Sequence, residues 1–260
     1  LGEMVREYAE EKGWPVVFHE EEELLDTGGG IGNMAADLMG ADHILLHNGD
    51  VLSSFGFEEA LDFHIAQQAL VTMILMKPEG GGRTPPAAVT VDAGGNVLDI
   101  GPSPVDPSRA LGYTGMAIIA GDALEYFPLK KKGLVPVLLE MISGRHGSVA
   151  GFDASAADDA AWGEIGSPLS YLDIHRMIML EKVLFDSKVP PPPMPLRTGD
   201  GASIDPGAQW NGFLDVGKGA HIEVNTFLED CVVMDGAVVR SGARLRSAII
   251  YDNDVLEVEK

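Results

Sequence analysis

The sequence has one cysteine and no long hydrophobic run, and each shortage excludes a class of protein. With only Cys231, the chain cannot form an intramolecular disulfide framework or a cysteine-rich metal site, and this cysteine content is compatible with the cytoplasm. No apolar run approaches the roughly 18 to 20 residues that a membrane-spanning helix needs. We therefore expect a soluble cytoplasmic protein without a membrane partner.

Basic residues are also scarce. The chain has 18 lysine and arginine residues against 40 aspartate and glutamate residues, which gives a net charge of −22. A surface of this sign repels nucleic acid and anionic lipid, so neither is expected as a partner. A nucleotide is still possible, because Mg²⁺ can supply the positive charge at a phosphate site.

The residues present are sufficient for a substantial core. A length of 260 residues allows one large or two modest domains, and 45% of the residues are hydrophobic. Residues 44–51 begin as a short apolar run, typical of a strand buried on both faces of a parallel sheet. The run ends at a turn, Asn48-Gly49, followed by Asp50. Asp50 could lie where open α/β sheets bind ligands, or it could cap the turn.

A glycine-rich segment precedes this strand. Residues 27–30 read Thr27-Gly28-Gly29-Gly30, between an acidic stretch and a helix predicted over residues 33–39. Three successive glycines allow bare backbone N–H groups to approach a partner closely. We interpret this segment as a loop that faces a ligand.

Helices and strands alternate over residues 1–186, which predicts a twisted, mainly parallel, Rossmann-like α/β sheet domain. Helical spacing covers residues 1–12, 57–68, 134–143 and 170–185, and strand patterns cover residues 70–76, 87–91, 96–100 and 113–119. His64 lies on one of these helices, where a structural role is favoured over catalysis. The chain opens directly on a helix, so we expect a segment before Leu1 to carry the first strand and its phosphate loop.

The second domain is predicted from a repeat. Five prolines in residues 189–195 indicate a stiff linker over residues 187–198. Beyond it, apolar residues recur every six positions, with one slip of a single residue: Ile204, Trp210, Val216, Ile222, Leu228, Val233, Val239 and Leu245. Hexapeptide repeats of this kind predict a left-handed parallel β-helix over residues 199–255.

Two carboxylates are candidates for metal binding. Asp50 follows a strand, and Glu164 lies in a strand-to-helix turn, Trp162-Gly163-Glu164-Ile165-Gly166-Ser167-Pro168. Mg²⁺ is typically held by one or two carboxylates together with substrate phosphates. The two residues therefore predict a magnesium site for phosphoryl or nucleotidyl transfer.

Four motifs and the repeat together resemble the sugar-phosphate nucleotidyltransferases, also called NDP-sugar pyrophosphorylases, with a C-terminal left-handed β-helix. The motifs are residues 25–31, Asn48-Gly49-Asp50-Val51, Tyr113-Thr114-Gly115-Met116 and residues 162–168. Their order and spacing cover nearly the whole chain. The glycine-rich segment is similar to those of mannose-1-phosphate guanylyltransferases and of muramic-type uridylyltransferases.

The resemblance implies a reaction and a set of roles. A sugar 1-phosphate oxygen attacks the α-phosphorus of an NTP, and pyrophosphate leaves. Asp50 and Glu164 would be the catalytic residues and Mg²⁺ ligands, and Thr114 and Gly115 would lie near the sugar. The nucleotide would be bound by Thr27, Gly28, Gly29, Gly30 and Asn48, with Gly28 and Gly29 against the base.

Two departures from the family pattern leave an alternative open. Glu164 stands where the family usually has aspartate, and residues 101–104 read Gly-Pro-Ser-Pro where a Glu-Lys-Pro motif is expected to hold the sugar phosphate. The alternative is a non-catalytic relative that binds nucleotide sugars as a regulatory or scaffolding subunit.

A possible homo-oligomer contact lies at the end of the repeat. Residues 248–251 form an apolar run with few charges, Ala-Ile-Ile-Tyr. Such a patch usually marks a contact surface, here with a second subunit or with the first domain. A last coil capped by the acidic tail at residues 252–259 would explain the same run.

Overall fold

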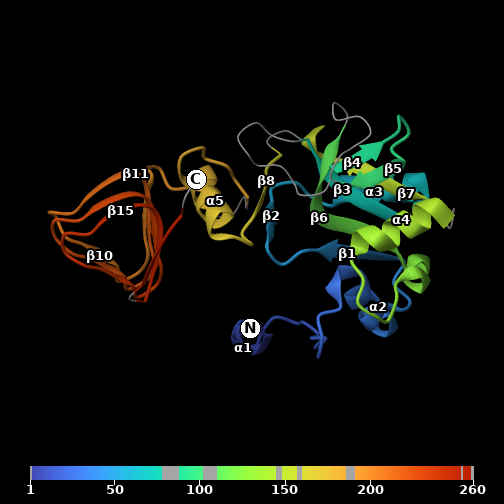
Figure 1. Cartoon of the computed structure of the whole chain (residues 1–260), viewed down its shortest axis with the longest axis horizontal. Coiled ribbons are helices and arrows are strands. Elements are labelled where there is room, and N and C mark those ends of the chain that lie inside the picture. The colour runs from blue at the N-terminus through green and yellow to red at the C-terminus, as the bar shows by residue number, and fades with distance from the viewer. Residues whose placement is uncertain are drawn as a thin grey trace. The chain divides into compact units, whose positions relative to one another are not determined.

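The computed structural model describes residues 2–77, 88–101, 110–144, 148–156, 160–185, 191–252 and 254–258 (Figure 1). The chain divides into two compact units. The first contains Leu1–His47 and Gly56–Ala154, and the second contains Asn48–Phe55 and Ser155–Lys260.

The first unit is built on a mixed sheet. Its strands run in the order β5 (Val97–Gly101), β4 (Ala88–Val91), β6 (Leu111–Ala120), β3 (Val71–Met76) and β7 (Val149–Asp153), and β1 (His43–His47) pairs with β6. Among the described strands of this sheet, only β3 and β7 pair in parallel: β6 lies antiparallel to β1, β3 and β4, and β4 lies antiparallel to β5. The prediction of a mainly parallel sheet was therefore wrong. An apolar run reveals burial on two faces but not the direction of the neighbouring strand.

The first strand of the unit also differs from its prediction. β1 alternates between half-buried residues that pack on the core, Ile44 and Leu46, and exposed ones such as Leu45, which is 50% exposed. It pairs with β6 alone among the described strands. Residues 44–46 are all apolar, so the sequence could not reveal that one face of this strand meets solvent.

Helices cover both faces of the sheet. On one face, α2 (Asp26–Leu38) and α4 (Leu134–Gly144) pack on Met73 and Leu75 of β3. On the other, α3 (Glu58–Gln67) lies against β3, and His64 bonds Thr72 between them. A short 3₁₀ helix, η2 (Gly121–Tyr126), follows β6, and α1 (Gly2–Glu11) begins the unit. The helices predicted over residues 1–12, 57–68 and 134–143 are confirmed.

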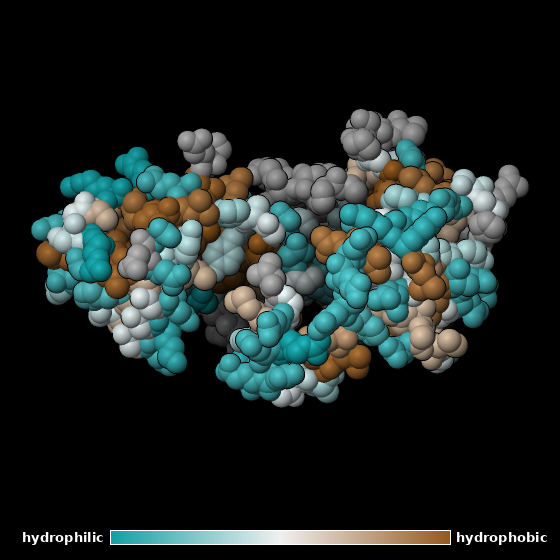
Figure 2. All heavy atoms as spheres, turned by 60° about the horizontal axis from the view of Figure 1, so that its bottom comes forward, coloured by the Kyte–Doolittle hydropathy of each residue, from teal (hydrophilic) through white to brown (hydrophobic). Residues whose placement is uncertain are grey.

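No helix in the described part of the chain is both long enough and apolar enough to cross a membrane. Hydrophilic residues cover much of the face shown in Figure 2, and hydrophobic residues reach that face in separate patches. In the first unit, α2 and α4 share the core cluster of the sheet and α3 contacts β3, whereas Ala9 is the only buried residue of α1.

The second unit contains a two-stranded ribbon, a helix and a β-solenoid. The ribbon is formed by β2 (Val51–Ser53) and β8 (Trp162–Glu164), which pair antiparallel. The helix is α5 (Pro168–Met179). One sheet of the solenoid joins β10 (Ser203–Ile204), β12 (His221–Ile222) and β14 (Val238–Val239), and the other joins β9 (Leu196–Thr198), β11 (Gln209–Val216), β13 (Phe227–Val233), β15 (Arg244–Tyr251) and β16 (Asp254–Glu257).

The six-residue repeat forms the solenoid core. Equivalent positions stack in three columns: Ile204, Ile222 and Val239; Trp210, Leu228 and Leu245; Val216, Val233 and Ile250. The solenoid has about three turns and confirms the repeat. Its left-handedness stays a prediction.

The one-residue slip in the repeat has a structural cause. Gly212 and Phe213 of one coil stand opposite the single residue Asp230 of the next. Asp230 adopts a left-handed backbone with φ of 54°, and Gly212 has φ of 67°. The shorter coil therefore turns its corner with one residue where the preceding coil uses two.

The end of the solenoid bears on the predicted oligomer contact. β16 pairs antiparallel with residues 248–251 of β15, and Ala248, Ile249 and Ile250 are buried. The capping alternative accounts for this apolar run. Self-association through the β-helix stays a prediction, and so does a domain boundary at residues 187–198, of which 187–190 lie outside the described residues.

Candidate functional site

The β2–β8 ribbon brings the two predicted carboxylates together. In its register, Val51 lies opposite Glu164, so Asp50 and Glu164 stand at the same end of the ribbon. The Ile165 N–H donates a hydrogen bond of 2.8 Å to the Asp50 carbonyl and extends the pairing by one step. Residues 114 positions apart in the sequence thus become neighbours within one compact unit.

Gly166 leaves the space between the two carboxylates open. A Cβ added to Gly166 would lie 2.9 Å from Asp50 Oδ2 and 3.3 Å from Glu164 Oε2. Both side chains therefore direct an oxygen toward the place that a larger residue would fill. Sequence reasoning did not single out this glycine, although its position two residues after Glu164 was a signal.

The donor set suits Mg²⁺ better than a metal that needs many protein ligands. The described residues contain no group of three or more His, Cys, Asp and Glu residues able to hold a metal ion. Mg²⁺ retains several waters and accepts one or two carboxylates plus substrate phosphates. Asp50 is exposed and Glu164 half-buried, so additional oxygen ligands could reach both.

Local hydrogen bonds fix the ribbon that presents the carboxylates. The Asn48 carbonyl accepts from the Val51 N–H at 3.3 Å and closes the turn before Asp50. At the other end, Ser54 donates through its N–H to the Ala161 carbonyl (3.0 Å) and accepts from the Ala161 N–H through Oγ (2.8 Å). The ribbon is therefore held at both ends.

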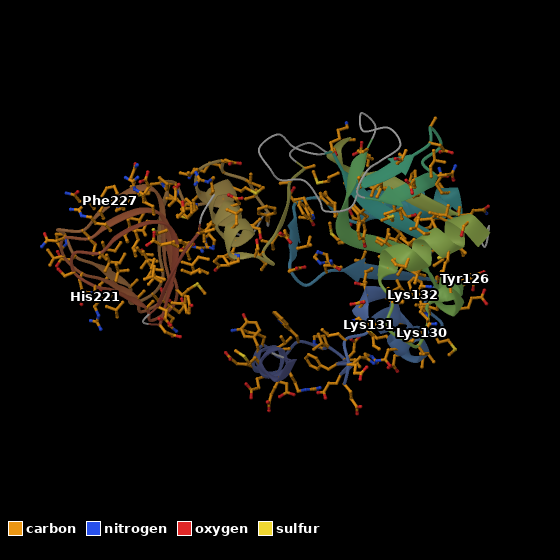
Figure 3. All side chains as sticks on the ribbon, viewed as in Figure 1. Tyr126, Lys130, Lys131, Lys132, His221 and Phe227 are labelled. Carbon is orange, nitrogen blue, oxygen red and sulfur yellow. The ribbon has the colours of Figure 1, made fainter. Side chains whose placement is uncertain are left out.

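The predicted glycine loop is wrong as a local structure, because residues 27–30 lie in the first turns of α2. Gly28 and Gly29 are buried against the backbone that precedes α4, and the Gly29 N–H donates to the Lys132 carbonyl at 2.9 Å. A Cβ at Gly28 would lie 2.7 Å from that carbonyl oxygen. Figure 3 shows Lys130, Lys131 and Lys132 beside this helix. The glycines permit helix–backbone packing, and their role toward a nucleotide stays a prediction.

The residues predicted to lie near the sugar form a bulge in the sheet. Between β3 and β6, Ile74 stands opposite the residues 114–116, and Gly115 has φ of 82°. The Thr114 hydroxyl donates to the Ile74 carbonyl at 2.7 Å, and Thr114 is fully buried. Bulges are common beside active sites, where they redirect side chains. A sugar contact by Thr114 and Gly115 stays a prediction.

The predicted site residues divide between the two units. Asn48, Asp50 and Glu164 belong to the second unit, whereas the residues 27–30, Thr114 and Gly115 belong to the first. The segment predicted to lack the Glu-Lys-Pro lysine lies mostly outside the described residues. The structure therefore joins the carboxylates to the solenoid unit rather than to the large sheet.

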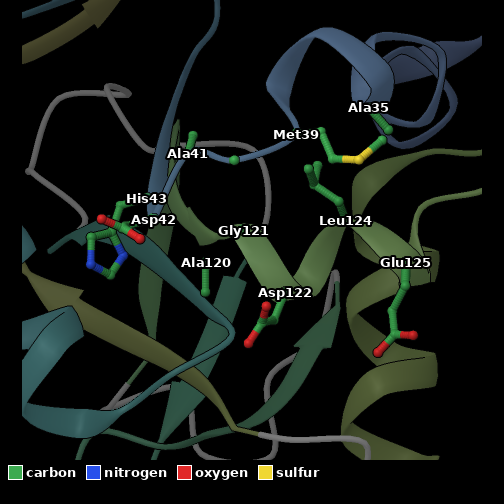
Figure 4. A pocket seen from close by; sticks show the side chains of 11 residues that line it. Ala35, Met39, Ala41, Asp42, His43, Ala120, Gly121, Asp122, Leu124 and Glu125 are labelled. Carbon is green, nitrogen blue, oxygen red and sulfur yellow. The ribbon is translucent and has the colours of Figure 1, made fainter.

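A pocket of about 1020 Å³ lies elsewhere, in the first unit, between the end of α2, the start of β1 and η2 (Figure 4). Its polar lining includes Asp42, His43, Asp122 and Glu125. None of the predicted site residues lines it. The pocket therefore lends no support to the predicted roles.

His64 has the structural role that was favoured for it. It is 1% exposed, and its Nδ1 lies 2.8 Å from Thr72 Oγ1. Burial, and then the nearby His43, lower the pKa of His64 to about 4. The ring is therefore neutral at pH 7 and belongs to the packing between α3 and β3.

Comparison with known proteins adds sequence relatives and folds. No family model matches the chain. A mannose-1-phosphate guanylyltransferase from Mycobacterium tuberculosis is 28% identical over 244 residues, covering 88% of this chain. The chain is a distant homologue of that enzyme. It spans 62% of the length of this curated relative.

Solved structures share the fold. The crystal structure of HddC from Yersinia pseudotuberculosis complexed with GMP-PN matches with a TM-score of 0.52 and 19% identity, over 66% of this chain and 72% of that one. A second HddC structure from the same organism also gives a TM-score of 0.52 and 19% identity, over 65% and 71%. At this identity the likeness concerns the fold alone.

Proposed function

We propose that the protein is a nucleotidyltransferase that joins an NTP and a sugar 1-phosphate to give an NDP-sugar and pyrophosphate. The observation that supports this most is the carboxylate pair, Asp50 and Glu164, directed at the space beside Gly166. Distant homology to a mannose-1-phosphate guanylyltransferase supports the same class of reaction.

The proposed chemistry requires little of the protein beyond positioning. A sugar-phosphate oxygen attacks the α-phosphorus of the NTP, the bond between the α- and β-phosphates breaks, and pyrophosphate leaves. Asp50 and Glu164 would hold Mg²⁺, which when bound neutralises charge on the phosphates. The extra methylene of Glu164, relative to aspartate, moves its carboxylate by roughly 1.5 Å, about one carbon–carbon bond length.

The nucleotide and sugar contacts belong to the proposal as well. Residues 27–30 and Asn48 would contact the nucleotide, with Gly28 and Gly29 near the base. Gly28 and Gly29 are packed from one side by the backbone of residues 130–133, so a base would have to approach the helix from another side. Thr114 and Gly115 would contact the sugar from the bulge in β6.

The test is pyrophosphate release by the protein at its natural length. GTP with mannose 1-phosphate is the first pair to use, because the homologue is named for that reaction and an HddC structure contains GMP-PN. Other NTPs and sugar 1-phosphates follow. We expect Mg²⁺-dependent release with at least one pair, and its loss in Asp50→Asn.

The non-catalytic alternative predicts a different result in the same assay. Two features favour it: Glu164 stands in place of aspartate, and residues 101–104 lack the lysine of the expected Glu-Lys-Pro motif. Nucleotide binding retained without turnover of any pair would decide for a regulatory or scaffolding relative. Turnover that persists unchanged in Asp50→Asn would show that the carboxylate pair has been misassigned.

A further inference from the structure

The carboxylate Glu164 is linked to the solenoid by a short segment and one helix. Only Ile165 and Gly166 separate it from Ser167, the N-cap of α5. Ser167 Oγ accepts from the Ser170 N–H (3.2 Å), and Ser170 Oγ accepts from the Ser167 N–H (3.1 Å), forming a capping box. The position of the N-terminus of α5 therefore restricts the position of Glu164, which lies only three residues before Ser167.

One side of α5 packs on the ribbon. Ile174 and Met177 share an apolar cluster with Ala161, and Leu52 of β2 packs against it. Gly163 of β8 lies so close to Ile174 that any Cβ there would collide with its side chain. The helix therefore supports both strands that carry the carboxylates.

Another side of α5 is bound to the solenoid by charged groups. His175 Nδ1 lies 2.7 Å from Asp215 Oδ2 on β11, and Arg197 on β9 pairs with the same carboxylate. Arg176 pairs with Asp230 at 2.5 Å. Asp215 is 4% exposed; burial raises its pKa, but the His175 and Arg197 hydrogen bonds hold the pKa below its usual range. A displacement of α5 would take His175 away from this buried, ionised carboxylate, and breaking a buried pair is strongly unfavourable.

Apolar packing completes this attachment. Leu172 and Met179 of α5 form one buried cluster with Phe213, Val232 and Ile249, whose side chains project from three successive long strands of the solenoid. Figure 1 shows α5 between β8 and the solenoid strands. Ribbon, helix and solenoid belong to one compact unit.

We propose that the solenoid sets the geometry of the metal-binding carboxylates through α5, and that Asp215 is the positioning residue at this junction. The inference rests on the proposed function of Asp50 and Glu164. It gives the solenoid a part in the reaction, since a displacement of α5 would be passed through two residues to Glu164. Groups that orient metal ligands without touching the metal commonly affect its affinity.

The experiment measures Mn²⁺ affinity by electron paramagnetic resonance, with Mn²⁺ as the probe for the Mg²⁺ site. Asp215→Asn should weaken Mn²⁺ binding about tenfold, in the range found for groups that orient metal ligands. Nucleotide binding measured without metal should be unchanged. Glu223→Gln is the control, because it breaks a solenoid pair with Arg240 and leaves the α5 contacts intact.

A second variant keeps the test decisive if Asp215→Asn unfolds. Arg176→Gln removes the contact with Asp230 while leaving Asp215, His175 and Arg197 in place, and it should weaken Mn²⁺ binding in the same direction. Unchanged affinity in a folded Asp215→Asn or, if that variant unfolds, in Arg176→Gln overturns the inference. Asp50→Asn separates the proposed function from the proposed role of the solenoid. If Asp50→Asn leaves Mn²⁺ binding intact, the proposed function fails. If Asp50→Asn is the only variant that loses Mn²⁺ binding, the role of the solenoid is overturned and the proposed function stands.

Discussion

At the scale of single residues, Gly166 is the position at which the smallest change should have the clearest effect. In Gly166→Ala, the new methyl group would lie 2.9 Å from Asp50 Oδ2 and 3.3 Å from Glu164 Oε2. We expect roughly tenfold weaker Mn²⁺ binding because the carboxylates must move apart. The thermal unfolding midpoint should change little, since Gly166 is exposed.

Gly49→Ala is the matched control for this substitution. Gly49 is adjacent to Asp50, and a Cβ there would meet no atom within 4 Å. Its Mn²⁺ affinity should equal that of the unmodified protein. Equal affinities for Gly166→Ala and Gly49→Ala would show that the space beside Gly166 is not used by a metal.

His64 predicts a pH dependence of stability. Its pKa is about 4 in the folded protein, lowered by burial and by His43, against 6.5 for the free group. The unfolded chain therefore binds more protons between these values, so the free energy of unfolding falls as the pH drops from 6.5 toward 4. The loss between pH 7 and pH 5 should be about 2 kcal/mol.

Urea unfolding at pH 7 and pH 5 measures this contribution. His64→Leu lowers stability at both pH values, because Thr72 loses its partner, but it removes the titrating group. The variant should lose less stability between the two pH values than the unmodified protein does. Identical losses in both proteins would assign the pH dependence to other groups.

Sequence reasoning at this scale predicted which two carboxylates lie together, but it did not predict the contacts around other site residues. Asp50 and Glu164 were paired from their types and their strand-end positions, and the ribbon brings them together. Gly166 was missed because a residue pattern does not reveal the open space that this glycine leaves between the two carboxylates. Thr114 was placed near a sugar, but the pattern could not show that its hydroxyl would bond the Ile74 carbonyl.

At the scale of elements, the glycines of α2 differ in whether the structure has room for a larger side chain. A Cβ at Gly32 would lie 2.8 Å from the Pro128 carbonyl carbon, which belongs to backbone and cannot rotate away. We expect Gly32→Ala to lower the free energy of unfolding by about 1 to 3 kcal/mol, as overpacking does. Thermal or urea unfolding would measure the change.

Gly30→Ala is the control on the same helix. Its Cβ would meet only Glu21 Oε1, at 2.9 Å, at the end of an exposed side chain. Alanine in a helix is favoured over glycine by about 0.5 to 1 kcal/mol, so this variant should be as stable as the parent protein or more so. Equal destabilisation by both substitutions would contradict the packing explanation.

The sequence predicted the solenoid coils well and the start of α2 poorly. Each coil of the solenoid places apolar residues at the same inward positions. The pattern therefore becomes clearer with every coil, as at Ile204, Ile222 and Val239. Residues 27–30 gave the opposite result, because glycine is a weak helix former and a local pattern cannot include the backbone of residues 130–133 that holds the helix. The direction of β6 was equally hidden, since strand pairing depends on distant residues.

At the scale of the whole molecule, the sequence and the structure divide the chain differently. The proline-rich stretch predicted a boundary at residues 187–198, whereas proximity groups α5 and residues 48–55 with the solenoid. Composition reveals where a chain is stiff and extended. It does not reveal that a helix preceding the prolines has its apolar side covered by strands that follow them.

A variant that ends at residue 185 tests which division governs folding. Without the solenoid, Leu172 and Met179 lose their buried partners, and His175 loses Asp215. We expect this variant to aggregate or to unfold around α5, and to bind Mn²⁺ at least tenfold more weakly, as when groups that orient metal ligands are removed. Sedimentation velocity and electron paramagnetic resonance would measure both effects.

A variant ending at residue 252 is the control, because it removes β16 and retains the solenoid strands that contact α5. A monomeric variant ending at residue 185 with unchanged Mn²⁺ affinity would instead establish the prolines as the boundary between independent domains.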